Sequence, residues 1–134
     1  MAKVLEVGNC DPDHAALRRM LTERFDVEID RVMFVDEALT RLRANDYALI
    51  LFNRLIFADH SPGLELVHRA KADPAINGAP IMMISNFEEA QAQSVAAGAV
   101  PGFGKNALFE EDTTRLLAQY LPPKGAWPAP KAAS

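Results

Sequence analysis

Five short apolar runs alternate along the chain with five amphipathic stretches, and this alternation constrains the fold more than any other feature of the sequence. The apolar runs predict strands at residues 3–7, 27–29, 47–52, 80–84 and 100–104. Strands that alternate with helices form a parallel sheet with right-handed crossovers, so that helices cover both of its faces. The run at 47–52 is almost wholly apolar, as expected of a strand buried on both faces. The sequence therefore predicts an α/β fold.

Local signals place the helices between these runs. Asp11 followed by Pro12 predicts a helix start, because aspartate caps a helix N-terminus and proline suits the first helical position. Ser61-Pro62 repeats the signal, and Gly98 is typical of the residue that ends a helix. The four later helices are predicted at residues 35–44, 63–73, 87–97 and 108–121.

The composition is that of one soluble domain. A length of 134 residues with a hydrophobic share of 49% suits a single core, which we assign to residues 1–121. Residues 122–134 form a tail rich in proline and alanine, in which Trp127 either docks on a surface or stays exposed. A net charge of −4 gives no basic patch for nucleic acid, and no apolar run is long enough for a membrane span. Without a secretory signal, and with Cys10 as its single cysteine, the chain is expected to be cytoplasmic.

A polar residue, Asn53, follows the apolar run at 47–52. In open parallel sheets, ligands and chemistry lie at the carboxyl ends of the strands. A carboxylate at this position could accept a phosphoryl group or bind a metal ion, whereas a neutral amide is poorly suited to either role. The identity of this residue therefore bears directly on function.

Four segments, taken together and in order, resemble a bacterial response-regulator receiver domain over roughly residues 3–121. The segment 47–53 resembles the third strand with its phosphoacceptor, and 63–66 resembles the start of the third helix. The segment 80–85 resembles the fourth strand with its terminal Ser/Thr, and Lys105, seven residues after Gly98, resembles the invariant lysine. The resemblance implies a flavodoxin-like, doubly wound, five-stranded parallel sheet of strand order 2-1-3-4-5 with five helices.

The chain departs from this family at its acidic residues. Active receivers carry two acids after the first strand, which hold a magnesium ion. Aligned without a gap, these positions fall on Gly8 and Asn9; with one inserted residue they fall on Asn9 and Cys10. The phosphoacceptor position is Asn53, and the loop that follows it is longer than in the family. Neither alignment restores the acidic pair.

The resemblance therefore implies a vestigial phosphorylation pocket made of Gly8, Asn9, Asn53, Ser85 and Lys105. Phosphoryl transfer needs an anionic oxygen nucleophile and a divalent cation, which carboxylates usually hold. Without the acids, Lys105 is expected to add uncompensated positive charge that repels a cation. We predict no metal, no cofactor, no enzymatic activity and no phosphorylation by small phosphodonors.

Two features of this pocket leave alternatives open. Asn53 either closes the end of its strand with a local hydrogen bond or locks one conformation by bonding Ser85 or Lys105, and Ser85 is also suited to cap the following helix. The apolar loop residues Leu55, Ile56 and Phe57 either form a lid over the former site or present a surface to a partner.

Two further residues stand out near the first strand. Glu6 lies where an apolar residue is expected, and burying an unpaired carboxylate is costly. We therefore expect Glu6 to be exposed at an edge or paired with a lysine or arginine. Cys10 is interpreted as a small packing residue rather than a redox sensor.

The leading hypothesis is a pseudo-receiver in two-component-type signalling, a protein–protein interaction module that works independently of phosphorylation. The implied partners are a histidine kinase, an output protein or another regulator. A homodimer would use the face formed by the predicted elements at 87–97, 100–104 and 108–121. Its expected residues are Glu88, Gln91, Ala92, Val95 and Phe103.

Two other functions remain open. In the first, an active receiver is phosphorylated at a displaced acid, either Asp11 or Asp59. In the second, a flavodoxin-like module binds a small molecule or flavin. No glycine-rich phosphate loop follows the first strand, which gives the second alternative little support.

Overall fold

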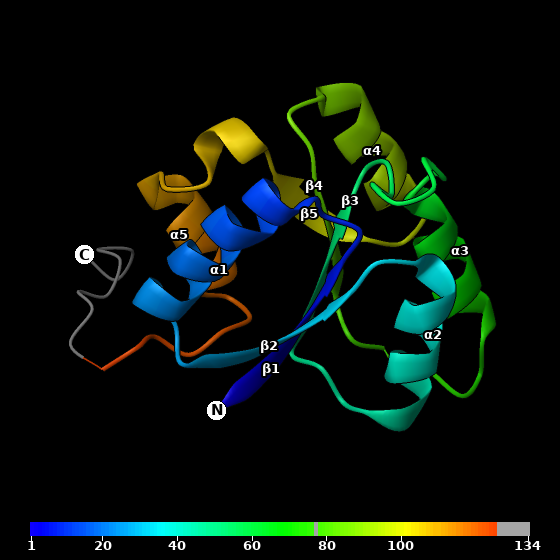
Figure 1. The fold of residues 1–134 in the computed structure, drawn as a ribbon, viewed down its shortest axis with the longest axis horizontal. Helices are drawn as coiled ribbons and strands as arrows, with labels where there is room; N and C mark the ends of the chain where they lie inside the picture. The colour runs from blue at the N-terminus through cyan, green and yellow to red at the C-terminus, as the bar shows by residue number, and fades with distance from the viewer. Residues whose placement is uncertain (77, 126–134) are drawn as a thin grey trace.

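The computed structural model describes residues 1–76 and 78–125 and contains one five-stranded parallel sheet of order β2-β1-β3-β4-β5 (Figure 1). The fold class and strand order predicted from the sequence are therefore confirmed. Trp127 and the rest of the predicted tail beyond residue 125 lie outside the described residues. The strands are β1 (Ala2–Val7), β2 (Val27–Val32), β3 (Leu49–Asn53), β4 (Ile81–Ile84) and β5 (Val100–Phe103).

Five α-helices cover the two faces of the sheet. In Figure 1, α1 and α5 lie on one side, and α2, α3 and α4 lie on the other. Their bounds are α1 (Asp11–Arg24), α2 (Val35–Ala44), α3 (Leu64–Ala72), α4 (Glu88–Ala96) and α5 (Glu111–Leu117), and a short 3-10 helix, η1 (Lys105–Ala107), precedes α5. None of the described helices is long and apolar enough to cross a membrane.

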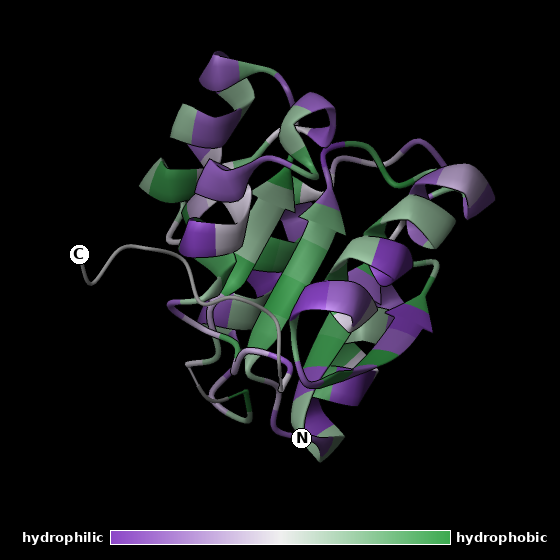
Figure 2. Ribbon diagram, turned by 90° about the vertical axis from the view of Figure 1, so that its left-hand side faces the viewer, coloured by the Kyte–Doolittle hydropathy of each residue, from purple (hydrophilic) through white to green (hydrophobic). Residues whose placement is uncertain are grey.

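The core is divided into two layers by the sheet. Side chains alternate along each strand, so Leu5 and Ile50 pack toward α2 and α3, whereas Val4 and Leu49 pack toward α1 and α5. Figure 2 shows the apolar strands at the centre, between helices that mix hydrophilic and hydrophobic residues. Because both faces are buried, the central strands read as continuous apolar runs.

Two elements differ most from the sequence-based boundaries, while the others agree within two residues at each end. The strand predicted at 27–29 continues to Val32, because β2 is an edge strand and keeps polar residues such as Asp30 and Arg31 partly exposed. The helix predicted from residue 108 begins only at Glu111, after η1. Leu108 is nevertheless buried, as a residue of the connection rather than of the helix.

The first residues of the predicted tail run beside the end of α1. The Pro122 carbonyl accepts a hydrogen bond from the Asp26 N–H at 3.0 Å, and the Lys124 N–H donates to the Arg24 carbonyl at 3.0 Å. These bonds hold the chain against the domain as far as Lys124.

Candidate functional site

Three of the predicted pocket residues meet at the carboxyl edge of the sheet. Asn53 ends β3 and pairs in register with Ile84 of β4, Ser85 follows β4, and Lys105 opens η1 after β5. They line one cavity of about 200 Å³, which we call the edge pocket. Its full lining is Asn53, Arg54, Leu55, Ile84, Ser85, Asn86, Phe87 and Lys105.

Gly8 and Asn9, which were predicted in the same pocket, do not line it. Asn9 instead lines a second, smaller cavity of about 70 Å³ together with Asp13 and Lys105. Lys105 therefore stands between the two cavities.

The space beside Gly8 is filled by Ile56. A Cβ atom at Gly8 would lie 2.6 Å from Ile56 Cδ1, closer than such atoms pack, and 3.2 Å from Ile56 Cα, which is a tight contact. The backbone of Gly8 has φ of 80°, a region that favours glycine, and its carbonyl accepts a hydrogen bond from the Phe57 N–H at 2.9 Å. An acidic side chain at this position would strain the backbone and require Ile56 to shift.

The apolar loop combines features of both alternatives predicted for it. Ile56 is fully buried and covers Gly8, as a lid would. Leu55 and Phe57 on either side are 41% and 57% exposed. One residue of the three thus fills the space beside Gly8, and its neighbours are more exposed.

Asn53 closes its strand with a local bond. Its side-chain Nδ2 donates to the Leu55 carbonyl at 2.6 Å. Within the described part of the chain it makes no hydrogen bond to Ser85 or Lys105, so the geometry favours the strand-closing role over the lock. Ser85 accepts a hydrogen bond on Oγ from the Phe87 N–H at 3.1 Å, directly before α4, which suits the capping role considered for it.

Lys105 is paired with an acid that the sequence analysis did not single out. Its Nζ lies 2.5 Å from Asp13 Oδ2, and this hydrogen bond is the main reason why the pKa of Asp13 falls below its ordinary value. The expectation of uncompensated positive charge at Lys105 is therefore wrong. Asp13 lies in the first turn of α1, where an acid is also explained by the helix dipole, so the sequence alone gave no reason to place it at Lys105.

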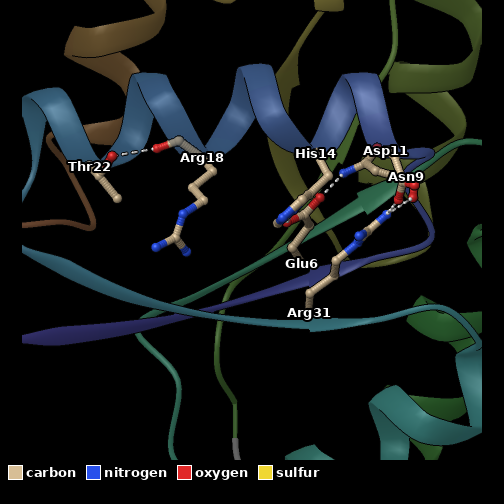
Figure 3. Close-up of polar contacts among 7 residues, drawn as sticks. All are labelled: Glu6, Asn9, Asp11, His14, Arg18, Thr22 and Arg31. Carbon is tan, nitrogen blue, oxygen red and sulfur yellow. Dashed lines mark hydrogen bonds and ion pairs between the residues drawn. The ribbon is translucent and has the colours of Figure 1, made fainter.

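Glu6 is the centre of a buried polar cluster beneath the start of α1 (Figure 3). Its carboxylate lies 2.6 Å from His14 Nδ1 and accepts a hydrogen bond from Asn9 Nδ2 at 2.9 Å. The prediction of an edge position or a lysine or arginine partner is therefore wrong. β1 lies inside the sheet, and the partner is a histidine on the helix above it. The Asn9 amide is thus committed to Glu6 and not to the edge pocket.

The two displaced acids considered as phosphoacceptors lie outside both cavities. Asp11 is 91% exposed and pairs with Arg31 at 2.8 Å. Asp59 accepts hydrogen bonds from the Ser61 hydroxyl at 2.6 Å and its N–H at 3.0 Å, which lower the pKa of Asp59. No group of three His, Cys, Asp or Glu side chains that could hold a metal is present within residues 1–76 and 78–125.

The face predicted for a homodimer is only partly available. Glu88, Ala92 and Val95 are exposed on α4. Phe103 is buried in the core, so its predicted place on that face is wrong. Gln91 ties α4 to the sheet edge: its Nε2 donates to the Met83 carbonyl at 2.9 Å, and its Oε1 accepts from the Gly102 N–H at 3.1 Å.

Comparisons with known proteins give matches in structure. No protein-family model matches the sequence, and no curated protein matches it. The receiver domain of Francisella response regulator 1452 superposes with a TM-score of 0.73 at 16% identity, over 90% of this chain and 97% of that one. The phosphorylated cyanobacterial phytochrome response regulator RcpA superposes with a TM-score of 0.69 at 19% identity, over 90% and 98%.

A longer protein matches over part of its length. NtrX from Brucella abortus superposes with a TM-score of 0.70 at 22% identity, over 88% of this chain but only 26% of NtrX. The chain therefore has the fold of response-regulator receiver domains, and in NtrX it corresponds to about a quarter of the protein.

Proposed function

We propose that the chain is a receiver-type signalling module that acts by binding another protein and does not use aspartyl phosphorylation. The observation that best supports the proposal is that Ile56 occupies the space at one of the positions where receivers carry acids. Ile56 fills the space beside Gly8, and the neighbouring strand ends in the amide of Asn53, which is bonded to its own loop. RcpA, which has the same fold, is found phosphorylated. In this chain the position that corresponds to a phosphoacceptor holds no carboxylate.

The contacts around the edge support the same proposal. Asp13 offsets the positive charge of Lys105 from the side of the smaller cavity, and no carboxylate lines the edge pocket. A divalent cation bound there would lack the hard anionic ligands that it prefers. The partner belongs to the proteins with which receivers work, namely a histidine kinase, an output protein or another regulator. We propose no catalytic role for the chain.

The alternative of a displaced phosphoacceptor gains no support from the structure. Asp11 is occupied by Arg31 and Asp59 by Ser61, and neither lines the pocket beside Lys105.

A magnesium titration followed by amide NMR tests the proposal. We expect no saturable chemical-shift change at residues 8–9, 53–55 or 85–87 on addition of Mg²⁺. The matched control is Arg69→Gln, which changes a charge on α3 away from the edge and is expected to behave like the parent. Saturable shifts at the strand ends would contradict the proposal, because they would show a working cation site.

A further inference from the structure

The edge pocket opens beside a larger groove, and the two share four lining residues. The groove has a volume of about 760 Å³ and lies between the loop after β3 and the start of α4. We call it the apolar groove. It is lined by Arg54, Leu55, Pro62, Leu64, Met83, Asn86, Phe87, Glu88, Glu89, Ala90 and Gln93, of which Arg54, Leu55, Asn86 and Phe87 also line the edge pocket.

The edge pocket is rich in hydrogen-bond donors. Ser85 Oγ already accepts a bond from the Phe87 N–H, which leaves its hydroxyl proton free to donate. The Asn86 Oδ1 accepts from the Asn106 N–H, and the Asn86 Nδ2 group donates to no described residue. Lys105 uses one of its three N–H groups on Asp13. Donors without partners and the absence of a lining carboxylate suit an oxyanion.

Arg54 adds a cation where the two cavities meet. Its guanidinium lies over the Phe87 ring, 4.9 Å from the ring centre, and it forms no ion pair with an acid of the described residues. The charge of Lys105 is offset by Asp13 on the side of the smaller cavity, so Arg54 supplies the net positive charge of the edge pocket. A guanidinium binds phosphate oxygens through two N–H groups at once.

The groove next to this cation presents apolar side chains to solvent. Phe87 is 60% exposed and Leu55 41% exposed, so both can contact the apolar part of a ligand. Glu88 and Glu89, which line the groove but not the edge pocket, form no ion pair within the described residues. Their charge disfavours an anion in the groove itself and so orients a ligand with its anionic end at Arg54.

We infer that the edge pocket and the apolar groove together bind an organic phosphomonoester without covalent transfer, with the phosphate beside Arg54, Ser85 and Lys105 and the apolar body along Phe87 and Leu55. This inference rests on the proposed function only in that the site forms no phosphoaspartate. The phosphate belongs either to a small molecule or to a phosphorylated side chain of a partner protein.

Amide NMR titrations of the whole chain test this inference with three probes. Phenyl phosphate carries both the anionic head and the apolar body, inorganic phosphate carries the head alone, and phenol carries the body alone. We expect phenyl phosphate to shift the amides of residues 53–55 and 85–87 saturably and to bind at least about fivefold more tightly than either partial probe. A peptide with one phosphoserine between leucines forms a fourth arm, and tighter binding of this peptide than of phenyl phosphate assigns the site to a partner's side chain.

Two variants separate the contribution of the phosphate group to binding from that of the apolar group. Arg54→Gln is expected to weaken phenyl phosphate and inorganic phosphate by about tenfold, as for loss of a charge-assisted bond. Phe87→Ala is expected to weaken phenyl phosphate by about threefold and to leave inorganic phosphate unchanged. The control Arg69→Gln removes a cation of α3 that lines neither cavity and should change nothing.

Three results would overturn the inference: no saturable binding of phenyl phosphate, equal affinity for phenol or inorganic phosphate, or binding that Arg54→Gln leaves unchanged. Intact mass is recorded on the same samples. A gain of one phosphate mass would contradict the proposed function, whereas failure to bind with an unchanged mass would contradict this inference alone.

Discussion

Lys105 and Asp13 show how one side chain changes the electrostatics of the edge. The Lys105 ammonium would otherwise face donors and amides with no acid nearby. Asp13, from the first turn of α1, reaches it at 2.5 Å and ties the helix to the segment after β5. Both side chains are about one third exposed, so solvent screens the pair and its contribution to stability is modest.

The stability conferred by this pair depends on pH in a defined direction. The pKa of Asp13 is lower in the folded protein than its ordinary value of 3.8, mainly because of the hydrogen bond from Lys105. Such a group contributes stability above the unfolded pKa and loses it as the pH falls through the folded pKa. We expect Asp13→Asn to lower the free energy of unfolding by about 0.5–1 kcal/mol at pH 7. The difference should shrink as the pH falls below the ordinary value of 3.8 and should disappear only below the lowered pKa of Asp13 in the folded protein.

Urea denaturation of the parent and Asp13→Asn proteins between pH 3 and 7 measures this difference. Asp112→Asn is a matched control, because that carboxylate is 88% exposed and pairs only at 3.4 Å with Arg115. A loss that stays constant down to pH 3 would show that the contact does not act through the charge of Asp13.

The connection between β3 and α3 is the element that most distinguishes this edge. Ile56 is fully buried against Gly8, the Phe57 N–H bonds to the Gly8 carbonyl, and the Gly63 N–H bonds to the Arg54 carbonyl at 2.8 Å. A Cβ at Gly63 would lie 2.1 Å from the Asn53 carbonyl oxygen, so the return of the loop also needs a glycine. The loop is thus packed against the domain through Ile56 and held by two backbone hydrogen bonds, rather than being a loose insertion.

The packing of Ile56 against Gly8 can be tested with a double-mutant cycle at these two residues. Gly8→Asp should destabilise the fold by roughly 2–5 kcal/mol, because its φ is positive and its side chain meets Ile56. Ile56→Ala should cost about 2–4 kcal/mol by emptying a buried site. If Ile56 is the obstacle, the double variant should lose at least about 1 kcal/mol less than the sum of the single losses. Additive losses in thermal or urea unfolding would show that Ile56 does not exclude an acid from this position.

Helix α1 is anchored to β1 through a buried pair. His14 contacts the fully buried Glu6, and removing His14 leaves this carboxylate with the Asn9 hydrogen bond but without its histidine partner. We expect His14→Ala to lower the free energy of unfolding by about 2–4 kcal/mol. Asp11→Ala, which breaks the exposed pair with Arg31 in the same turn, should cost less than about 1 kcal/mol. Equal losses in urea denaturation at pH 7 would contradict the anchoring role of Glu6 and His14.

At the scale of the whole molecule, the sequence predicts the architecture well and the site only in part. The apolar runs mark the strands because burial on both faces leaves them continuous, and the weakest prediction was the polar edge strand β2. Asn53, Ser85 and Lys105 were placed at one edge because parallel strands end there together. The partners of Glu6 and Lys105 were missed because His14 and Asp13 lie on a helix, and the rotation of α1 over the sheet is set by packing rather than by local sequence.

The proposed function also depends on the molecule as a whole. The molecule has the sheet and the helical layers of the receiver fold, Ile56 fills the space beside Gly8, and Asn53 is bonded to its own loop. Among the described residues, no carboxylate lines the edge pocket. Under the proposed function the module signals through its surfaces, one of which contains the apolar groove of about 760 Å³.

Intact-mass measurement after incubation with a small phosphodonor tests the central claim most directly. The protein is treated with acetyl phosphate and excess Mg²⁺ at pH 7, beside the Asn53→Asp variant. The account predicts an unchanged mass for the parent. It also predicts an unchanged mass for the variant, because Ile56 still fills the space beside Gly8 and no second acid is restored. A gain of one phosphate mass by the parent protein, mapped to any aspartate, would contradict the account.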